Sequence, residues 1–125
     1  MHSDFSRAER LGEQIHRELS GLIQRELKDP RVGMVTIGEV EVSSDLSYAK
    51  VYYTILGDPD SHTETQQGLD RAAGFLRSQL GRRLRTRLTP GLKFIFDDSE
   101  QRGARIDAAI AAARLQDDHA RSDDS

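Results

Sequence analysis

The chain has 125 residues, no cysteine and no tryptophan, and a formal net charge of −3 at pH 7. A chain of this length suits one domain with a modest core, and the lack of cysteine excludes disulfides, thiol catalysis and cysteine-based zinc sites. The N-terminus has no basic region followed by an apolar stretch, and no apolar run approaches the ~20 residues that span a bilayer. We therefore expect a soluble protein of the cytoplasm that does not interact with membranes.

The charges are unevenly distributed along the chain. Residues 1–70 carry a net charge of −6, residues 71–96 carry +7, and residues 97–125 carry −4. The central block contains seven basic and no acidic side chains: Arg71, Arg77, Arg82, Arg83, Arg85, Arg87 and Lys93. A concentrated basic block on an acidic protein attracts a polyanion locally and repels it elsewhere, which favours one docking orientation.

The first predicted element is a helix over residues 6–28. Ser6 and Glu9 have the spacing of a capping box at its start. Apolar residues then recur at helical spacing: Ala8, Leu11, Ile15, Leu19, Leu22 and Ile23. Asp29-Pro30 ends the helix, because the residue before a proline is disfavoured in the α region.

Two strands are predicted next. Val35 and Ile37 alternate on odd positions, whereas Val40 and Val42 alternate on even positions, so a β-bulge is expected at 38–39. Residues 43–47 have turn chemistry, and alternation resumes over 49–55. This pattern predicts an antiparallel hairpin with one face packed on a core.

A second helical region follows residues 57–60, with Ser61 and Glu64 as a capping-box candidate. Its apolar residues are Leu69, Ala72, Ala73, Leu76, Leu80 and Leu84. Gly74 and Gly81 interrupt it, and since each costs about 1 kcal/mol relative to alanine, a kink or break is expected. Phe75 is expected to be buried, so the basic block itself gives little support for base stacking.

The rest of the chain holds a third strand and a last helix. Leu92, Phe94 and Phe96 alternate after Pro90-Gly91, and Ile106, Ala109, Ile110 and Ala113 form an amphipathic stretch. Residues 116–125 contain four Asp and no large apolar residue, which predicts a disordered acidic tail after a single domain over 1–115. Helices and strands are partly segregated, which predicts an α+β two-layer sandwich.

Four segments, in order, resemble the ribosome-binding factor A family over about residues 5–115. They are LKDPRVG at 27–33, VSSDLSYAKVY at 42–52, AAGFLRSQLG at 72–81 and RTRLTPGLKF at 85–94. The resemblance implies a type II KH-like fold with an α-β-β-α-(kink)-α-β order and a C-terminal helix. In this family Ala-x-Gly, here Ala72-Ala73-Gly74, replaces the Gly-x-x-Gly loop that clamps single strands in other KH domains.

The resemblance also implies a function. Members bind the immature small (30S) ribosomal subunit and its 16S rRNA, and assist late maturation and processing of that RNA, with particular importance in the cold. Assembly GTPases release some members. No cofactor is implied, and a monomer is expected. The chain has no Gly-x-x-Gly, so contact of a basic helix face with structured RNA is more plausible than reading of a four-nucleotide strand.

The basic block can be placed on an ideal helix relative to Leu80. Arg71, Arg82 and Arg85 then point to solvent, Arg77 and Arg83 flank the apolar stripe, and Arg87 falls on the apolar side, which indicates that the helix has frayed there. Lys93 faces away from Phe94 on the third strand. Arginine suits bidentate phosphate contact, but pairing of the block with carboxylates of the first helix or the tail is an alternative. Lys28 and Arg31 are a second candidate contact, with helix termination as the alternative.

Enzymatic functions are not supported. The four histidines, His2, His16, His62 and His119, lack metal-ligand spacing. Asp97-Asp98 is better explained by a turn and helix N-cap than by a paired-carboxylate site, because adjacent strand residues point to opposite faces. Besides RNA binding, docking of the basic helix on an acidic protein partner stays open. Membrane-surface binding by a basic amphipathic helix is disfavoured, because the short apolar stripe is needed for the core.

Overall fold

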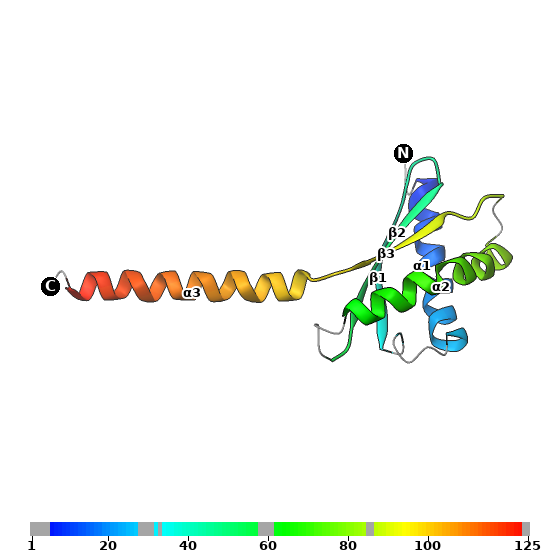
Figure 1. Cartoon of the computed structure of the whole chain (residues 1–125). Coiled ribbons are helices and arrows are strands. Elements are labelled where there is room, and N and C mark those ends of the chain that lie inside the picture. The colour runs from blue at the N-terminus through cyan, green and yellow to red at the C-terminus, as the bar shows by residue number, and fades with distance from the viewer. Residues whose placement is uncertain (1–5, 28–31, 33, 58–61, 85–86, 124–125) are drawn as a thin grey trace.

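The computed structural model describes residues 6–27, 32, 34–57, 62–84 and 87–123, with side chains described up to residue 117. The elements are α1 (Arg7–Glu26), β1 (Val35–Val42), β2 (Tyr48–Ile55), α2 (His62–Arg83), β3 (Gly91–Phe96) and α3 (Ser99–Asp123). The strands form one sheet in the order β1-β2-β3, and α3 projects away from the body that contains the other elements (Figure 1). The predicted α+β class and the predicted sheet of three strands are confirmed.

Helix α1 begins where its capping residues predict. The Ser6 hydroxyl oxygen accepts a hydrogen bond from the backbone N–H of Glu9 at 3.2 Å and donates to the Glu9 carboxylate at 3.2 Å. This cap satisfies one of the free N–H groups of the first turn. The predicted apolar stripe is buried at Leu11, Ile15, Leu19, Leu22 and Ile23. The helix ends at Glu26, and the predicted stop at residues 29–30 lies outside the described residues.

Strands β1 and β2 form the predicted antiparallel hairpin. Ile37 pairs with Tyr53 and Val40 pairs with Val51, so the register shifts between Ile37 and Val40, which confirms the bulge. The extra residue explains why the buried side chains of β1 change from odd to even positions. Both halves of the strand therefore keep their apolar side chains toward the helices.

The hairpin turn is held by Asp45. Its Oδ1 accepts hydrogen bonds from the Ser43 hydroxyl at 2.7 Å, the Ser47 hydroxyl at 2.7 Å and the Ser47 backbone N–H at 3.1 Å. These donors stabilise the charged carboxylate and lower the pKa of Asp45 to about 2. Leu46 takes a positive φ of 64° beside it. The turn chemistry predicted for 43–47 is confirmed.

Strand β3 lies beside β2 and is parallel to it. A parallel neighbour needs a crossover connection, and α2 provides it. The helices pack on one face of the sheet, since Ala49, Val51 and Tyr53 of β2 and Phe94 of β3 join the leucines of α1 and α2 in one core. The alternating residues of these strands are left on the opposite face, which no helix of the body covers.

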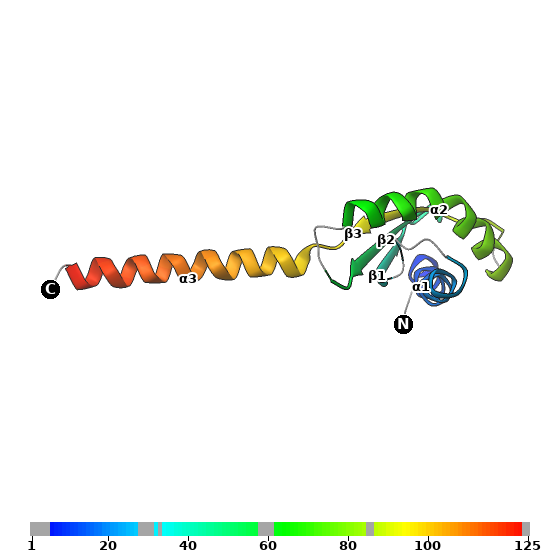
Figure 2. The same ribbon diagram turned by 60° about the horizontal axis from the view of Figure 1, so that its bottom comes forward.

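A kink or a break was predicted in helix α2, and the structure has the kink but no break. The helix is continuous from His62 to Arg83 and passes through Gly74 and Gly81, and its ribbon changes direction near the middle (Figure 2). Leu69 precedes Gly74, Leu76 and Leu80 follow it, and all three are fully buried. A glycine in a helix interior costs about 1 kcal/mol relative to alanine. Burial of the leucines on both sides of Gly74 offsets this cost, so the helix stays continuous. The capping candidate Ser61 lies outside the described residues.

Helix α3 differs from the predicted disordered tail. It is helical to Asp123, so most of the segment 116–125 continues the helix. Its central run of alanines has high helix propensity and extends the helix into the acidic residues. The predicted apolar positions Ile106 and Ile110 are exposed and do not join the core. The domain boundary at residue 115 stays a prediction, while α3 leaves the two-layer body soon after Phe96.

Candidate nucleic-acid interface

The outward side of α2 forms a surface that combines small, basic and aromatic residues. Leu69, Leu76 and Leu80 face the sheet, so residues about half a turn away face solvent. We call this surface the α2 outer face: Arg71, Gly74, Phe75, Ser78, Gly81 and Arg82, all of which are exposed. The three small residues lie at i, i+4 and i+7, so a polyanion backbone can approach the helix closely between the arginines.

Two arginines of the α2 outer face carry uncompensated charge. Among the described residues, neither Arg71 nor Arg82 lies within 4 Å of a carboxylate. The Phe75 side chain lies on the same side of the helix, one turn after Arg71 and two turns before Arg82, and is 44% exposed. Its predicted burial is wrong, because leucines form the side of α2 that packs on the sheet, and Phe75 lies on the opposite side of the helix. An exposed aromatic ring between two guanidinium groups can stack on a base while phosphates contact the arginines.

A hollow adjoins the α2 outer face where the helix meets the segment leading into β3. It has a volume of about 460 Å³ and is lined by Gly74, Arg77, Ser78, Gly81, Arg87, Leu88 and Thr89. Arg77 donates two hydrogen bonds to the Thr89 carbonyl oxygen, from Nε at 3.1 Å and from Nη2 at 2.9 Å. Arg77 therefore positions the wall of the hollow and keeps part of its guanidinium group for an anion.

Arg83 is partly neutralised. Its Nη1 lies 3.6 Å from Oε2 of Glu18 on α1, and both side chains are about one third exposed. The alternative that the basic block pairs with carboxylates of the first helix is therefore confirmed for this arginine. Its position on the flank of the apolar stripe, as predicted, brings it toward α1 and away from the α2 outer face.

The predicted basic block does not form one surface. Lys93 faces away from the buried Phe94, as predicted, but it lies on the open face of the sheet, opposite the helix layer. Ala72 and Ala73 are partly buried against the core and belong to the continuous helix. The remaining candidates, Arg85, Lys28 and Arg31, lie outside the described residues.

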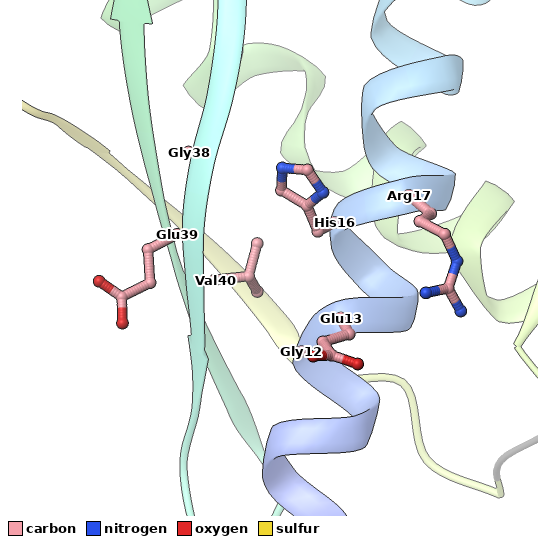
Figure 3. A pocket seen from close by; sticks show the side chains of 7 residues that line it. All are labelled: Gly12, Glu13, His16, Arg17, Gly38, Glu39 and Val40. Atoms are coloured by element: carbon pink, nitrogen blue, oxygen red, sulfur yellow. The ribbon is translucent and has the colours of Figure 1, made fainter.

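A second hollow lies between α1 and β1 (Figure 3). It has a volume of about 440 Å³, and its lining includes Glu13, His16, Arg17 and Glu39. His16 points from α1 toward β1, where its Nε2 donates to the Ile37 carbonyl oxygen at 3.1 Å. Glu13 offsets the charge of Arg17, and the Glu39 side chain points away from the hollow, so the hollow has no positive excess and does not favour phosphate (Figure 3).

The residues considered for catalysis have structural roles. Asp97 accepts a hydrogen bond from the Ser99 backbone N–H at 2.9 Å, and bonds with Ser99 lower the pKa of Asp97. Asp98 contacts Arg102 at 2.8 Å. Both carboxylates therefore serve the start of α3, as predicted. Within the described ranges, no three His, Asp or Glu side chains are placed to hold a metal ion.

None of the described helices combines enough length with enough apolar character to cross a bilayer.

Known proteins match the chain over nearly its whole length. The sequence model of ribosome-binding factor A matches residues 7–110. Ribosome-binding factor A of Thioalkalivibrio sulfidiphilus is 55% identical over 124 residues, which cover 99% of this chain and 96% of the relative.

Solved structures agree. The crystal structure of ribosome-binding factor A from Thermus thermophilus aligns with a TM-score of 0.64 and 32% identity, over 71% of this chain and 93% of that one. A Thermus thermophilus homology model fitted into the cryo-EM map of a 30S–RbfA complex aligns with a TM-score of 0.58 and 32% identity. The alignment covers 70% of this chain and 91% of that one. With its sequence and its fold both matched, the chain belongs to the ribosome-binding factor A family.

Proposed function

We propose that this protein binds the small ribosomal subunit by docking the α2 outer face on 16S rRNA. The observation that carries the proposal is that Arg71 and Arg82 have no carboxylate within 4 Å among the described residues and lie on the same side of α2 as the exposed ring of Phe75. Family membership supports the choice of partner, as does the Thermus thermophilus relative that was fitted into a map of a 30S complex.

The contacts follow from the chemistry of the surface. Arg71 and Arg82 would contact phosphates, and the small residues between them would let the RNA backbone lie against the helix. Arg77 and Arg87 would each contact a further phosphate at the adjoining hollow. We also propose contacts for Arg85, Lys28 and Arg31 from their place in the sequence. Lys93 lies on another face, and Arg83 is partly neutralised, so neither belongs to this surface.

The mechanism would be binding without chemistry. A ligand shifts a folding equilibrium only by its differential affinity for the two states, so the protein would bind a late intermediate of 16S rRNA more tightly than the finished form. It would thereby assist maturation and processing of that RNA, most importantly in the cold. The protein would act as a monomer in the cytoplasm, and an assembly GTPase would promote its release.

The test is cosedimentation of the purified protein with separated small and large subunits across a salt series. If Arg71, Arg77, Arg82, Arg85 and Arg87 each contact one phosphate, the log–log slope of affinity against salt is about −3.5 to −4.5. The double substitution Arg71→Ala and Arg82→Ala should reduce its magnitude by about 1.4–1.8. The matched control is Arg105→Ala with Arg114→Ala, which removes the same charge from exposed positions on α3.

The outcomes separate the competing functions. Salt-sensitive binding confined to the small subunit, weakened by the α2 variant and unchanged by the α3 variant, supports the proposal. An unchanged slope in the α2 variant would exclude this surface as the contact. Equal binding to both subunits would reduce the activity to general attraction for polyanions. Association that survives removal of RNA by nuclease would favour an acidic protein as the partner.

A further inference from the structure

The face of the sheet opposite the helices carries its own set of side chains, most of which are exposed, whereas Tyr52 and Ile95 are half-buried. Because strand residues alternate between faces, the burial of Ala49, Val51 and Tyr53 leaves the intervening residues of β2 on the other side. We call this surface the open sheet face: Glu41 on β1, Tyr48, Lys50 and Tyr52 on β2, and Lys93 and Ile95 on β3. No helix of the described chain covers it, since α1 and α2 pack on the opposite side and α3 projects away (Figure 1).

The register of the sheet brings two cations together. Lys50 pairs with Lys93 across β2 and β3, so their side chains leave the same face about 5 Å apart at the backbone. Glu41 is the partner of Lys50 on the other side. Even so, within the described part of the chain neither lysine lies within 4 Å of a carboxylate. The two ammonium groups are therefore available to an external anion.

Two tyrosines flank these lysines along β2. Tyr48 is 58% exposed, and its partner on β3 is Gly91, where an added Cβ would lie 4.0 Å from Cδ1 of the ring. The glycine therefore leaves the ring of Tyr48 uncovered from the β3 side. Tyr52 lies four residues further along, about 13 Å away, with Ile95 beside it. A hollow of about 210 Å³ adjoins Tyr48 and Lys50.

The acidic and basic residues of the open sheet face lie on different strands. The acidic residues lie on β1, where Glu41 is the acceptor for the Tyr52 hydroxyl at 3.5 Å and Glu39 points away from α1 at the bulge (Figure 3). The lysines lie on β2 and β3. A phosphate backbone would therefore follow the β2–β3 side of the face, where the potential is positive, and avoid β1.

We propose that the open sheet face binds an unpaired segment of RNA, with bases stacked on Tyr48 and Tyr52 and phosphates held by Lys50 and Lys93. Proteins that bind single-stranded nucleic acid combine aromatic rings, on which bases stack, with basic side chains that contact the phosphates. The site lies in the sheet layer, whereas the α2 outer face lies on the far side of the helix layer. The protein would thus hold two RNA segments on opposite sides, which goes beyond docking through α2.

The tyrosines themselves provide the assay. The chain has three tyrosines and no tryptophan, and Tyr53 is fully buried, so quenching of tyrosine fluorescence reports on the open sheet face. Titration with a short unstructured oligoadenylate at low salt should quench this fluorescence. Anisotropy of a labelled oligoadenylate should show roughly 5- to 100-fold weaker binding for Tyr48→Leu, while Tyr48→Phe keeps the ring and the affinity.

Charge variants test the same site without removing a ring. Lys50→Gln with Lys93→Gln should reduce the magnitude of the salt slope by about 1.4, because a single strand contributes about 0.7 per phosphate contact. Glu41→Gln should strengthen binding. Both positions of the lysine pair are exposed, so this variant stays informative if a tyrosine variant fails to fold.

Failure of this inference can be told apart from failure of the α2 proposal. Arg71→Ala with Arg82→Ala should leave tyrosine quenching unchanged if the open sheet face is a separate site. Loss of quenching in that arginine variant would overturn the separate site. Absence of quenching at low salt, or wild-type affinity in Tyr48→Leu, would exclude RNA as the occupant of the open sheet face.

Discussion

The glycines of the two packed helices allow one substitution to be compared in two environments. Gly12 lies on the buried side of α1, where an added Cβ would be 2.8 Å from the Val40 backbone oxygen and 3.6 Å from Cγ2 of Val42. The first distance is too short, and the atom met is backbone at the bulge of β1. Alanine gains about 1 kcal/mol in a helix interior, but overpacking costs about 1–3 kcal/mol. We therefore expect Gly12→Ala to lower the free energy of unfolding by about 1 kcal/mol.

Gly74 of α2 is the matched comparison. A Cβ added there meets nothing within 4 Å, and the residue is exposed in a continuous helix. Only the helix-propensity term then acts, so Gly74→Ala should raise the free energy of unfolding by about 0.5–1 kcal/mol. The two variants should differ by about 2 kcal/mol, or roughly 8–16 °C in melting temperature.

Urea and thermal unfolding followed by far-UV circular dichroism would measure both variants, because the chain has no tryptophan to serve as a fluorescent probe. A stabilised Gly12→Ala variant would show that α1 can move away from β1 and that the close approach is not required. A destabilised Gly74→Ala variant would show that the bend of α2 requires glycine, as the resemblance to the family first indicated.

Two further predictions concern ionisable groups. Tyr53→Phe should cost about 1–3 kcal/mol, because the Tyr53 hydroxyl donates to Oε1 of Gln66 at 2.6 Å and its loss leaves that oxygen unpaired. Burial raises the pKa of Tyr53 to about 12 from 10.0. The free energy of unfolding of the wild type, measured in urea, should therefore fall relative to that of Tyr53→Phe as the pH rises from 10 to 12. The lowered pKa of Asp45 acts in the opposite direction: its contribution is present above pH 3.8 and is lost as the pH falls toward about 2. NMR titration should place the Asp45 carboxyl in that range, and the stability difference from Asp45→Asn should shrink there; a titration near 3.8 would contradict the hydrogen bonding of the turn.

Local patterns predicted most of the fold. The helical spacing of α1 and the change of parity in β1 are properties of neighbouring residues, and both are found where expected. The continuity of α2 could not be predicted this way, since it depends on leucines packing against the sheet on both sides of Gly74. The parallel pairing of β3 with β2 is likewise a long-range choice, and α3 was extended by helix propensity where composition had predicted disorder.

The candidate sites were predicted only in part, for the same reason. The solvent-facing positions of Arg71 and Arg82 follow from helical geometry alone. Phe75 was missed because aromatic residues are usually buried, although its angular position beside Arg71 and Arg82 is a signal that could have found it. Lys50 was missed because it lies far from the basic block in sequence, and only the strand register brings it beside Lys93.

The position of α3 decides whether the acidic C-terminus competes with RNA. With 25 residues the helix is about 37 Å long, and it points away from the C-terminal half of α2 (Figure 1). Charges farther apart than about 8 Å are largely screened at physiological ionic strength. Deleting residues 116–125 should therefore leave the affinity for RNA unchanged at that salt concentration.

A nearby carboxylate supplies the positive control for this deletion. Glu18→Gln removes a carboxylate that lies 3.6 Å from Arg83 and so raises the positive potential beside Arg82. It should strengthen binding by less than about fivefold, because the ion pair is partly exposed. If the deletion strengthens binding more than Glu18→Gln does, α3 must fold back over the basic surface in solution. If only Glu18→Gln changes the affinity, the carboxylate that limits RNA binding is on α1, and the acidic end of α3 is free to contact something else.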